Sequence, residues 1–267
     1  MDAKEFRIRG KEMVDLVADY LENIESRPVL PSVKPGYLKE MLPDHAPDQP
    51  EKWEDLVVDI ERCIMPGVTH WHHPNFHAYF PTAHSFPSIC ADMLSDSIAC
   101  IGFSWIASPA CTELEVIMMD WLAKALQLPE FYLASSNGKG GGVIQGTASE
   151  STLVSLLAAR NKVTNEVKLE HPEWSDSEIR SKLVAYCSEQ AHSSVERATL
   201  LGSVMCKKLK VDGKFSVRGE TVQQQIEKDR KAGLIPFFVC ATLGTTSICS
   251  YDNIMEIGPI CKFNLTF

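Results

Sequence analysis

The sequence predicts an α/β fold in which a parallel-rich sheet is covered by helices on both faces. Two short, nearly continuous apolar segments, residues 183–187 and 236–242, are each followed by a polar loop and then by a helical pattern. Strands that alternate with helices favour a parallel sheet, and apolar runs of this kind are typical of strands buried on both faces. A good helical pattern over residues 149–163 precedes the first of these strands.

The first 85 residues indicate a helical arm. Apolar residues recur at helical spacing over residues 3–25 and again over residues 50–64. Prolines at positions 28, 31 and 35 impose an extended linker between these two helices. Short helices on a proline-rich arm cannot bury their own apolar faces, so we expect them to pack on the rest of the chain or on a partner subunit.

The middle of the chain is expected to contain two largely buried helices. Residues 76–82 form a short apolar segment that ends in a proline turn, and residues 86–101 and 109–128 have the wide apolar stripes of buried helices. The glycine-rich stretch 138–142 then predicts a flexible loop. It is not a nucleotide-binding P-loop, because neither Ser nor Thr follows Lys139 and the upstream glycine is absent.

The last part of the chain predicts the α/β alternation element by element. Strands are expected at residues 143–145, 183–187, 206–211, 214–217 and 236–242, and helices at residues 149–163, 193–201 and 219–232. Asp252 or Asn253 is expected to cap a last helix that runs through about Ile257. The sequence contains no internal repeat and no low-complexity segment.

Composition excludes several classes of function. The 267 residues are 45% hydrophobic and 23% charged, and 26 basic against 35 acidic residues give a net charge of −9. This balance argues against non-specific binding of nucleic acid or anionic membranes. The N-terminus has no apolar h-region, and no run approaches the roughly 18 apolar residues of a membrane span, so neither a secretory signal nor a membrane helix is expected.

The cysteines indicate a reducing, cytoplasmic environment. There are nine, an odd number, and none forms a CxxC pair, which fits free thiols better than a disulfide framework. Five of them lie in apolar surroundings and are expected to be small core residues: Cys90, Cys100, Cys111, Cys187 and Cys240.

Three loops beyond predicted strands or before predicted helices are candidate ligand sites, because open α/β sheets bind ligands beyond the carboxyl ends of their strands. In residues 146–151, Ser149 can cap a helix whose first N–H groups would suit a phosphate; the alternative is an ordinary helix cap. In residues 190–194, His192 could stack on a planar cofactor or transfer a proton; the alternative is a structural histidine. Residues 243–246 offer hydroxyls for a polar cofactor edge, or form a simple turn.

A metal site is not expected. The histidines at positions 70, 72, 73 and 77 lie close together in the sequence, but their spacing matches no known ligand pattern. No cysteine or carboxylate joins this cluster.

Seven stretches of sequence together resemble the group II pyridoxal-phosphate-dependent decarboxylases, and within them the aromatic-L-amino-acid (DOPA) decarboxylases of insects. These stretches are residues 66–72 (PGVTHWH), 77–82 (HAYFPT), 101–105 (IGFSW), 108–115 (SPACTELE), 140–146 (GGGVIQG), 191–197 (AHSSVER) and 241–246 (ATLGTT). The resemblance runs almost continuously from residue 1 to about Cys261 and covers roughly half of a full family member.

The resemblance implies an aspartate-aminotransferase-like fold of the type I pyridoxal-phosphate class. Residues 1–85 would be an N-terminal helical dimerisation arm, and residues 86–267 would be a partial cofactor-binding large domain whose C-terminal part and small domain are missing. The family's members are homodimers that bind pyridoxal 5'-phosphate. The implied reaction is decarboxylation of aromatic L-amino acids, such as L-DOPA, 5-hydroxytryptophan or tyrosine, to amines and CO2, as in catecholamine biosynthesis.

The resemblance also implies roles for individual residues. Ala148 and Ser149 would hold the cofactor phosphate, and Thr246 would contact the cofactor. The catalytic residue His192 would stack on the cofactor ring and contact the substrate. The substrate-binding residues would be Trp71, Tyr79, Phe80 and Pro81 around the aromatic side chain, Thr82 near the carboxylate, and Ile101 and Phe103 in the neighbouring subunit's pocket.

The end of the chain departs from the family pattern. The aspartate that holds the ring nitrogen and the Schiff-base lysine would follow the point where residues 262–267 replace the expected continuation, so this chain alone is expected to be inactive. One alternative is a non-catalytic short isoform that pairs through residues 1–110 with full-length subunits. Another is an aromatic acetaldehyde synthase. The resemblance implies asparagine at the position of His192 in insect enzymes of that kind, so His192 favours plain decarboxylation.

Overall fold

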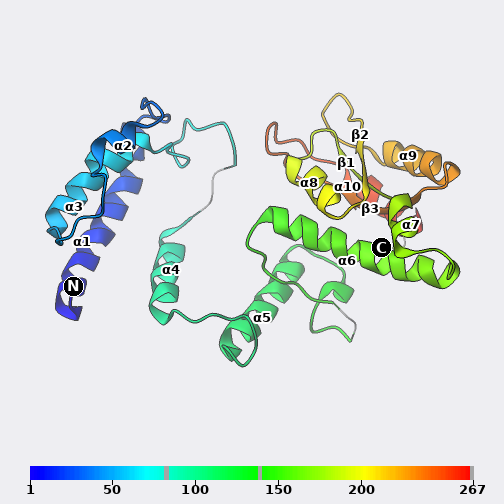
Figure 1. Cartoon of the computed structure of the whole chain (residues 1–267), viewed down its shortest axis with the longest axis horizontal. Helices are drawn as coiled ribbons and strands as arrows, with labels where there is room; N and C mark the ends of the chain where they lie inside the picture. The colour runs from blue at the N-terminus through cyan, green and yellow to red at the C-terminus, as the bar shows by residue number, and fades with distance from the viewer. Residues whose placement is uncertain (81–83, 138–139, 265–267) are drawn as a thin grey trace. The chain divides into compact units, whose positions relative to one another are not determined.

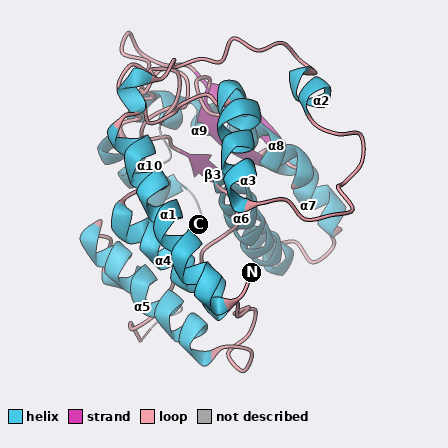
Figure 2. Ribbon diagram, turned by 90° about the vertical axis from the view of Figure 1, so that its left-hand side faces the viewer, coloured by secondary structure: helices cyan, strands magenta, loops and turns pink. Residues whose placement is uncertain are grey.

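The computed structural model describes residues 1–80, 84–137 and 140–264 and divides the chain into two compact units (Figure 1). Unit 1 is Met1–Ser85 and unit 2 is Phe86–Phe267. Helices predominate over strands, as the colouring of Figure 2 shows. In the described part of the chain, no helix combines the length and apolar character needed to cross a membrane.

Unit 1 is built from helices, as its apolar periodicity predicts. Its first helix is capped by Asp2, whose carboxylate accepts the backbone N–H groups of Lys4 and Glu5 at 2.8 Å each. The elements are α1 (Ala3–Glu22), a 3-10 turn (Ile24–Ser26), α2 (Tyr37–Met41), α3 (Trp53–Asp59), a π-helical turn (Ile60–Ile64) and a second 3-10 turn (Met65–Gly67). The helices predicted over residues 3–25 and 50–64 are thus confirmed, although α3 continues as a π turn.

Polar contacts fix the shape of unit 1, while much of its apolar surface stays open. Arg27 makes a two-pronged ion pair with Glu61, and Tyr20 hydrogen-bonds His70 at 2.8 Å. Beside these contacts lies a groove of about 930 Å³, lined by Met13, Leu16, Val17, Tyr20, Val57, Val58, Met65 and other residues. The open groove agrees with the expectation that these helices cannot bury their own apolar faces.

The first part of unit 2 corrects the prediction of two buried helices. The helices exist, as α4 (Phe86–Ile98) and α5 (Pro109–Ala125), but α4 buries no residue and α5 buries only Asp120 and Ala123. Leu94 is 61% exposed and Trp121 is 62% exposed. An apolar stripe is buried only where another element covers it, and the described residues of unit 2 do not cover these stripes.

The sheet of unit 2 has three parallel strands in the order β2-β1-β3. The strands are β1 (Leu183–Ser188), β2 (Met205–Leu209) and β3 (Ile235–Cys240). Two predicted strands are wrong. Residues 143–145 pair with no strand, and the N–H of Ile144 instead donates to Glu115 on α5. Residues 214–217 lie after a turn in which the carboxylate of Asp212 accepts the N–H of Lys214 and of Ser216.

Helices cover both faces of this sheet, as predicted, and pack two hydrophobic cores against it (Figure 1). The helices are α6 (Ala148–Glu170), α7 (Asp176–Lys182), α8 (Ser193–Leu201), α9 (Gly219–Lys231) and α10 (Ile254–Asn264). One core joins α6 and α7 to the sheet through Leu156, Ala159, Val163, Ile179, Leu183, Ala185 and Phe237. The other joins α9 and α10 to the opposite face through Val184, Tyr186, Leu209, Val217, Val222, Ile226 and Ile257.

A buried carboxylate ties three of these elements together. Asp229 on α9 is 1% exposed and accepts hydrogen bonds from Tyr186 on β1, Lys207 on β2 and Gln225 on its own helix. Burial alone would raise the pKa of Asp229, but the hydrogen bonds from these three groups hold it below its ordinary value. The same carboxylate and burial raise the pKa of the Tyr186 phenol.

The cysteines are all free, but they are less buried than predicted. Cys187 is buried, Cys111 and Cys240 are half-buried, and Cys90 and Cys100 are exposed. The prediction of five core cysteines is therefore wrong for Cys90 and Cys100. Cys90 lies on α4, whose apolar stripe is uncovered, and Cys100 lies in the loop that follows that helix.

Candidate functional site

The carboxyl ends of β1 and β3 lie side by side at one edge of the sheet. These two parallel strands are neighbours, yet the chain leaves β1 toward α8 on one face and leaves β3 toward α10 on the other. Strands whose connections diverge in this way leave room between their ends, and open α/β sheets bind ligands there. The loop with His192 follows β1 and the loop with Thr246 follows β3, so both candidate loops lie at this edge of the sheet.

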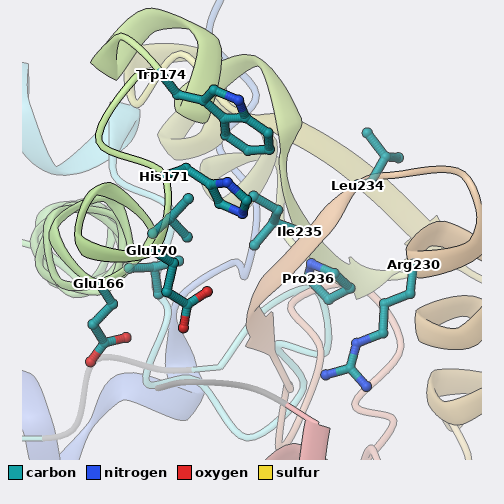
Figure 3. Close-up of a pocket in the computed structure, with 10 residues that line it drawn as sticks. Glu166, Glu170, His171, Trp174, Arg230, Leu234, Ile235 and Pro236 are labelled. Atoms are coloured by element: carbon teal, nitrogen blue, oxygen red, sulfur yellow. The ribbon is translucent and has the colours of Figure 1, made fainter.

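The start of α6 is directed toward the same edge of the sheet. The last turns of α6 lie beside Ile235 and Pro236 at the beginning of β3, where they line a cavity of about 290 Å³ (Figure 3). A helix of 23 residues is about 34 Å long, whereas a strand of six residues spans about 20 Å. Because α6 packs on the sheet with its C-terminus at this edge, its N-terminus lies toward the carboxyl edge, on the side of α8 in Figure 1.

The cavity in Figure 3 therefore belongs to the edge opposite the candidate loops. Its wall includes a parallel stack of His171 and Trp174, with ring centroids 4.1 Å apart and an angle of 8° between the planes. Lys182, at the end of α7, places its Nζ atom 4.9 Å from the centroid of the Trp174 ring. No sequence-predicted site residue lines it.

The first turn of α6 differs from the prediction in its cap. Thr147, not Ser149, is the N-cap: its hydroxyl accepts the N–H of Glu150 at 3.1 Å. Ala148 and Ser149 are consequently the first two residues of the helix, where backbone N–H groups have no partner within the helix. Ser149 is exposed and its hydroxyl makes no hydrogen bond within the described residues. This leaves two N–H donors and a hydroxyl available to an anion at a helix N-terminus.

The segment just before the glycine-rich stretch is held against α5. The carboxylate of Asp120 accepts the N–H groups of Ala134 and Ser135 at 2.7 and 3.1 Å, and these hydrogen bonds lower the pKa of Asp120. A Cβ at Gly140 would lie 2.3 Å from the carbonyl oxygen of Phe131, so the backbone requires glycine there. Two residues of the loop predicted to be flexible, 138 and 139, lie outside the described residues.

His192 is the N-cap of α8, with an exposed side chain. Its Nδ1 accepts the N–H of Ser194 at 3.2 Å and lies 2.8 Å from the Ser194 hydroxyl. Because Nδ1 accepts, the proton of the neutral ring belongs on Nε2. The ring is thereby held by its own helix, and the side chain as a whole is exposed.

Thr246 lies in a tight turn after β3 that is fixed by its neighbours. Thr245 is buried, and its hydroxyl lies 3.0 Å from that of Ser250, while Thr246 itself is exposed. The buried carboxylate of Asp252 accepts the N–H of Thr242 at 2.8 Å and that of Val217 at 2.9 Å. The turn therefore presents the Thr246 hydroxyl at a fixed place beside the strand ends.

Three lysines, two on β2 and one directly after it, are each paired with a carboxylate. Lys207 binds Asp229, Lys208 binds Glu196 and Lys210 binds Glu189. The hydrogen bond from Lys210 lowers the pKa of Glu189, and that to Glu196 raises the pKa of Lys208. These amines are therefore not free nucleophiles.

The residues expected to bind the substrate fall into two groups that the structure does not place relative to each other. In unit 1, Trp71 stacks on Phe76 at 5.3 Å and lies 5.4 Å from Tyr79, and the neighbouring Phe80 is exposed. Pro81 and Thr82 lie outside the described residues. In unit 2, Ile101 and Phe103 are 74% and 84% exposed in the loop between α4 and α5.

Four histidines of unit 1 are hydrogen-bonded to neighbouring groups. His70 pairs with Tyr20, His72 lies 2.7 Å from His84, and Nδ1 of His73 accepts the N–H of Asn75. Burial lowers the pKa values of His70 and His72. Within the described ranges, no group of three or more potential ligands is arranged for a metal ion.

The sequence of this chain matches a known family over most of its length. Residues 35–266 match the pyridoxal-dependent decarboxylase conserved domain. The chain belongs to this family of pyridoxal-dependent decarboxylases. The resemblance drawn from the seven motifs is thus confirmed, including its restriction to part of a family member.

Relatives of this family are similar to nearly the whole chain. Aromatic-L-amino-acid decarboxylase of Mus musculus is 62% identical over 98% of this chain and 55% of its own length. The enzyme of the same name from Drosophila melanogaster is also 62% identical, over 97% of this chain and 51% of its own length. The chain therefore spans about half the length of the curated relatives that it matches.

Solved structures of the family have the same fold. Catharanthus roseus tryptophan decarboxylase, in complex with L-tryptophan, aligns with a TM-score of 0.88 at 39% identity, over 99% of this chain and 56% of that one. Rhodiola rosea 4-hydroxyphenylacetaldehyde synthase aligns with a TM-score of 0.87 at 39% identity, with the same coverage. The predicted type I fold, present here in part, is confirmed by these structures.

The described residues fit the family's cofactor. The free N–H groups of Ala148 and Ser149 match a phosphate, the fixed ring of His192 matches a planar pyridine, and the Thr246 hydroxyl matches a polar edge. All three belong to the same edge of one sheet.

Sequence reasoning missed three residues that build this edge. Thr147 could have been identified, because Thr147 and Glu150 have the S/T-x-x-E spacing of a helix start. Asp252 was identified only as a helix cap; Asn253 holds that position and accepts the N–H of Glu256. Nothing in the sequence marks Asp120, whose backbone partners lie 14 and 15 residues away.

Proposed function

We propose that this chain forms part of a pyridoxal-phosphate-dependent decarboxylase of aromatic L-amino acids, with L-DOPA as the first candidate substrate and an amine and CO2 as products. The observation that carries the proposal is the meeting of the α6 start, His192 and Thr246 at one sheet edge. Close similarity to aromatic-L-amino-acid decarboxylases supports it.

In this proposal each loop has a separate task. The N–H groups of Ala148 and Ser149 and the Ser149 hydroxyl bind the phosphate, and the Thr246 hydroxyl binds a polar edge of the cofactor. The His192 ring stacks on the cofactor, orients it and can hold a proton on Nε2. When bound, the cofactor supplies the electron-withdrawing ring that makes loss of CO2 feasible.

The aromatic wall around the substrate comes from both groups of apolar residues. Trp71, Tyr79, Phe80 and Pro81 would enclose the aromatic side chain, and Thr82 would contact the carboxylate. Ile101 and Phe103 would enter the neighbouring subunit's pocket. Holding the carboxylate in one orientation is the main contribution that such a wall makes to rate.

The test measures cofactor binding and turnover separately. The longer natural form of the protein is assayed for CO2 release from L-DOPA, 5-hydroxytryptophan and tyrosine. Release from none of them would refute the proposed activity. The 267-residue chain is assayed in parallel, and we expect weak cofactor binding without turnover. CO2 release by the short chain, together with a borohydride-trapped cofactor–lysine adduct, would contradict that expectation.

A second candidate function is that of a non-catalytic dimer partner. The uncovered stripes of α4 and α5 and the groove beside α1 favour it, because exposed apolar surface of this extent marks an interaction site. The homodimer expected for the family would use the same surfaces. Co-expression with the longer form tests the idea: failure to co-purify and unchanged activity of the longer form would exclude it.

A third candidate is an aromatic acetaldehyde synthase, since one structural relative carries that activity in its name. His192 favours plain decarboxylation, and release of hydrogen peroxide during turnover would reverse that preference. A cytoplasmic location completes the proposal, because all nine cysteines are free thiols.

A further inference from the structure

Two thiols meet beside the loop that carries Ile101 and Phe103. Cys100 lies just after α4 and Cys111 lies in the first turn of α5, and their sulfur atoms are 3.4 Å apart. Cys100 is exposed and Cys111 is half-buried. The chain between them, residues 101–110, forms a closed excursion whose two ends are held together at these sulfurs.

The backbone is folded so that this approach is close. Ala99 has a φ of 50°, in the left-handed region, and turns the chain immediately before Cys100. Gly102 then lies against Cys111, because a Cβ at position 102 would be 2.6 Å from the Cys111 Cβ. A disulfide has an S–S length of about 2.05 Å, so the sulfurs must approach by only about 1.3 Å. Rotation of the two cysteine side chains can supply this movement.

The surroundings of Cys100 favour its thiolate. Its Sγ lies 3.6 Å from the hydroxyl of Ser108, and hydrogen bonding with Ser108 and then with Cys111 lowers the pKa of the Cys100 thiol. Cys187 and Cys206 differ from this pair in their backbone and not in acidity, because the hydrogen bond with Cys187 lowers the pKa of Cys206 to about 6. Their sulfurs are 3.8 Å apart, but they lie on the paired strands β1 and β2, at positions that are not opposite each other. Strand pairing holds the backbones of Cys187 and Cys206, whereas Cys100 lies outside any helix or strand.

We propose that Cys100 and Cys111 form an oxidisable dithiol, in which hydrogen peroxide produces an intrachain disulfide that closes the loop of residues 101–110. The Cys100 thiolate attacks one oxygen of the peroxide, the O–O bond breaks, and sulfenic acid and hydroxide form. The Cys111 thiol then attacks the sulfenic sulfur, the S–O bond breaks, and water leaves. Overall, two thiols and one peroxide give one disulfide and two waters.

The consequence of this closure rests on the proposed function. Ile101 and Phe103 lie inside the closed loop, and in that proposal they reach the neighbouring subunit's substrate pocket. The disulfide restricts the positions that these two side chains can take. It therefore acts mainly on the fit of the aromatic substrate, and so on KM.

The first experiment detects the bond without reference to activity. The purified protein is treated with hydrogen peroxide, unreacted thiols are alkylated, and the chain is digested with chymotrypsin without reduction. Cleavage after Phe103 and Trp105 separates the two cysteines, so the disulfide joins two peptides in the mass spectrum. We expect this linked pair to be the main cross-linked product and to disappear on reduction with dithiothreitol.

Variants identify the two steps. Cys111→Ser should abolish the linked pair and leave a sulfenic acid on Cys100 that dimedone traps, whereas Cys100→Ser should abolish both. Cys90→Ser is the matched control, an exposed cysteine of α4 that should not change the yield. Absence of the linked pair in the unmodified protein, or equal oxidation of Cys90 and Cys100, would overturn the proposal.

The second experiment uses the longer natural form and compares KM for the aromatic substrate before and after oxidation. We expect a reversible change of about three- to tenfold. An unchanged KM with the disulfide present would refute the effect on substrate fit. Absence of decarboxylation in either redox state would refute the proposed function, while the linked peptides would still establish the dithiol.

Discussion

The two halves of unit 2 use similar apolar residues in opposite ways. All six residues of β1 are buried, whereas none of the 13 residues of α4 is. In the sheet half, the side chains of β1 pack into a helix-covered core on one face or the other: Leu183 and Ala185 on one, Val184 and Tyr186 on the other. In the α4–α5 half, the apolar stripes have no cover within the described part of unit 2. Apolar periodicity therefore predicts that a helix exists, but not that this chain covers it.

This difference separates residues that hold the fold from residues that await a partner. Burial of apolar area is the main favourable term in folding, and it is present in the sheet half and small in the α4–α5 half. The dimer proposed above would explain the presence of large apolar side chains on an uncovered surface. Substitutions in the two halves should consequently fail in different assays.

The largest expected effect is on a core aromatic residue. Phe237 on β3 is fully buried between the sheet and α6, so Phe237→Ala should lower the free energy of unfolding by about 3–5 kcal/mol. Trp121→Ala on α5, where the side chain is 62% exposed, should change it by less than about 0.5 kcal/mol. Urea unfolding of both variants measures the contrast, and equal losses would show that α5 is covered after all.

The next effect concerns the buried carboxylate network. Asp229→Asn removes the charge that binds Lys207 and should lower the free energy of unfolding by about 2–3 kcal/mol at neutral pH. The loss is at the low end for a broken buried ion pair, because Lys207 is partly exposed. Glu196→Gln, which breaks the exposed pair with Lys208, is the matched control and should cost at most about 0.5 kcal/mol.

The same network predicts a pH dependence. The pKa of Asp229 is lower in the folded chain than its ordinary value near 3.8, so its ionised form stabilises the fold. This contribution is fully present above the unfolded pKa and is lost as the pH falls through the folded pKa. Unfolding measured from pH 6 down to pH 2 should therefore show a smaller acid loss in Asp229→Asn than in the parent. Parallel curves would assign the acid sensitivity to other carboxylates.

A third prediction tests the uncovered half directly. Trp121→Ser removes the largest exposed side chain of α5, and exposed aromatic residues often dominate protein–protein contacts. We expect the dissociation constant for self-association to rise by tenfold or more, corresponding to about 1.4–2 kcal/mol, with the unfolding curve unchanged. Sedimentation at several concentrations measures this. Unchanged association would place the partner surface elsewhere, for example on the groove beside α1.

Most of the fold could be predicted from local patterns, and the errors have a common cause. The helix Ser193–Leu201 begins and ends as predicted, because its apolar period and its cap are local features. Residues 143–145 and 214–217 have strand-like composition but no neighbouring strand to pair with. The exposure of α4 and Cys100 likewise depends on what lies across from them. Pairing and covering are tertiary facts that a local pattern does not contain.

The candidate site shows the same division. Ser149, His192 and the loop that contains Thr246 were suggested by their places at the end of a strand or the start of a helix, whereas Ala148 was suggested by the family resemblance. The parallel topology brings these loops to one edge. The placement of Trp71 and Tyr79 relative to that edge could not be predicted, because they belong to the other unit. Their grouping in one substrate wall stays a prediction.

The smallest expected effect distinguishes the cap of α6 from its ligand-facing residue. Thr147→Ala removes the hydroxyl that accepts the N–H of Glu150 and should lower the free energy of unfolding by about 1 kcal/mol. Ser149→Ala should leave stability within about 0.5 kcal/mol, because the Ser149 hydroxyl has no partner within the described residues. If Ser149 binds the cofactor phosphate, its alanine variant should instead weaken cofactor binding by about tenfold, in line with one lost hydrogen bond to a charged group. Titration with pyridoxal 5'-phosphate, followed by absorbance, tests this. A stability loss in Ser149→Ala with unchanged binding would make Ser149 part of the helix start and leave the phosphate to the backbone N–H groups alone.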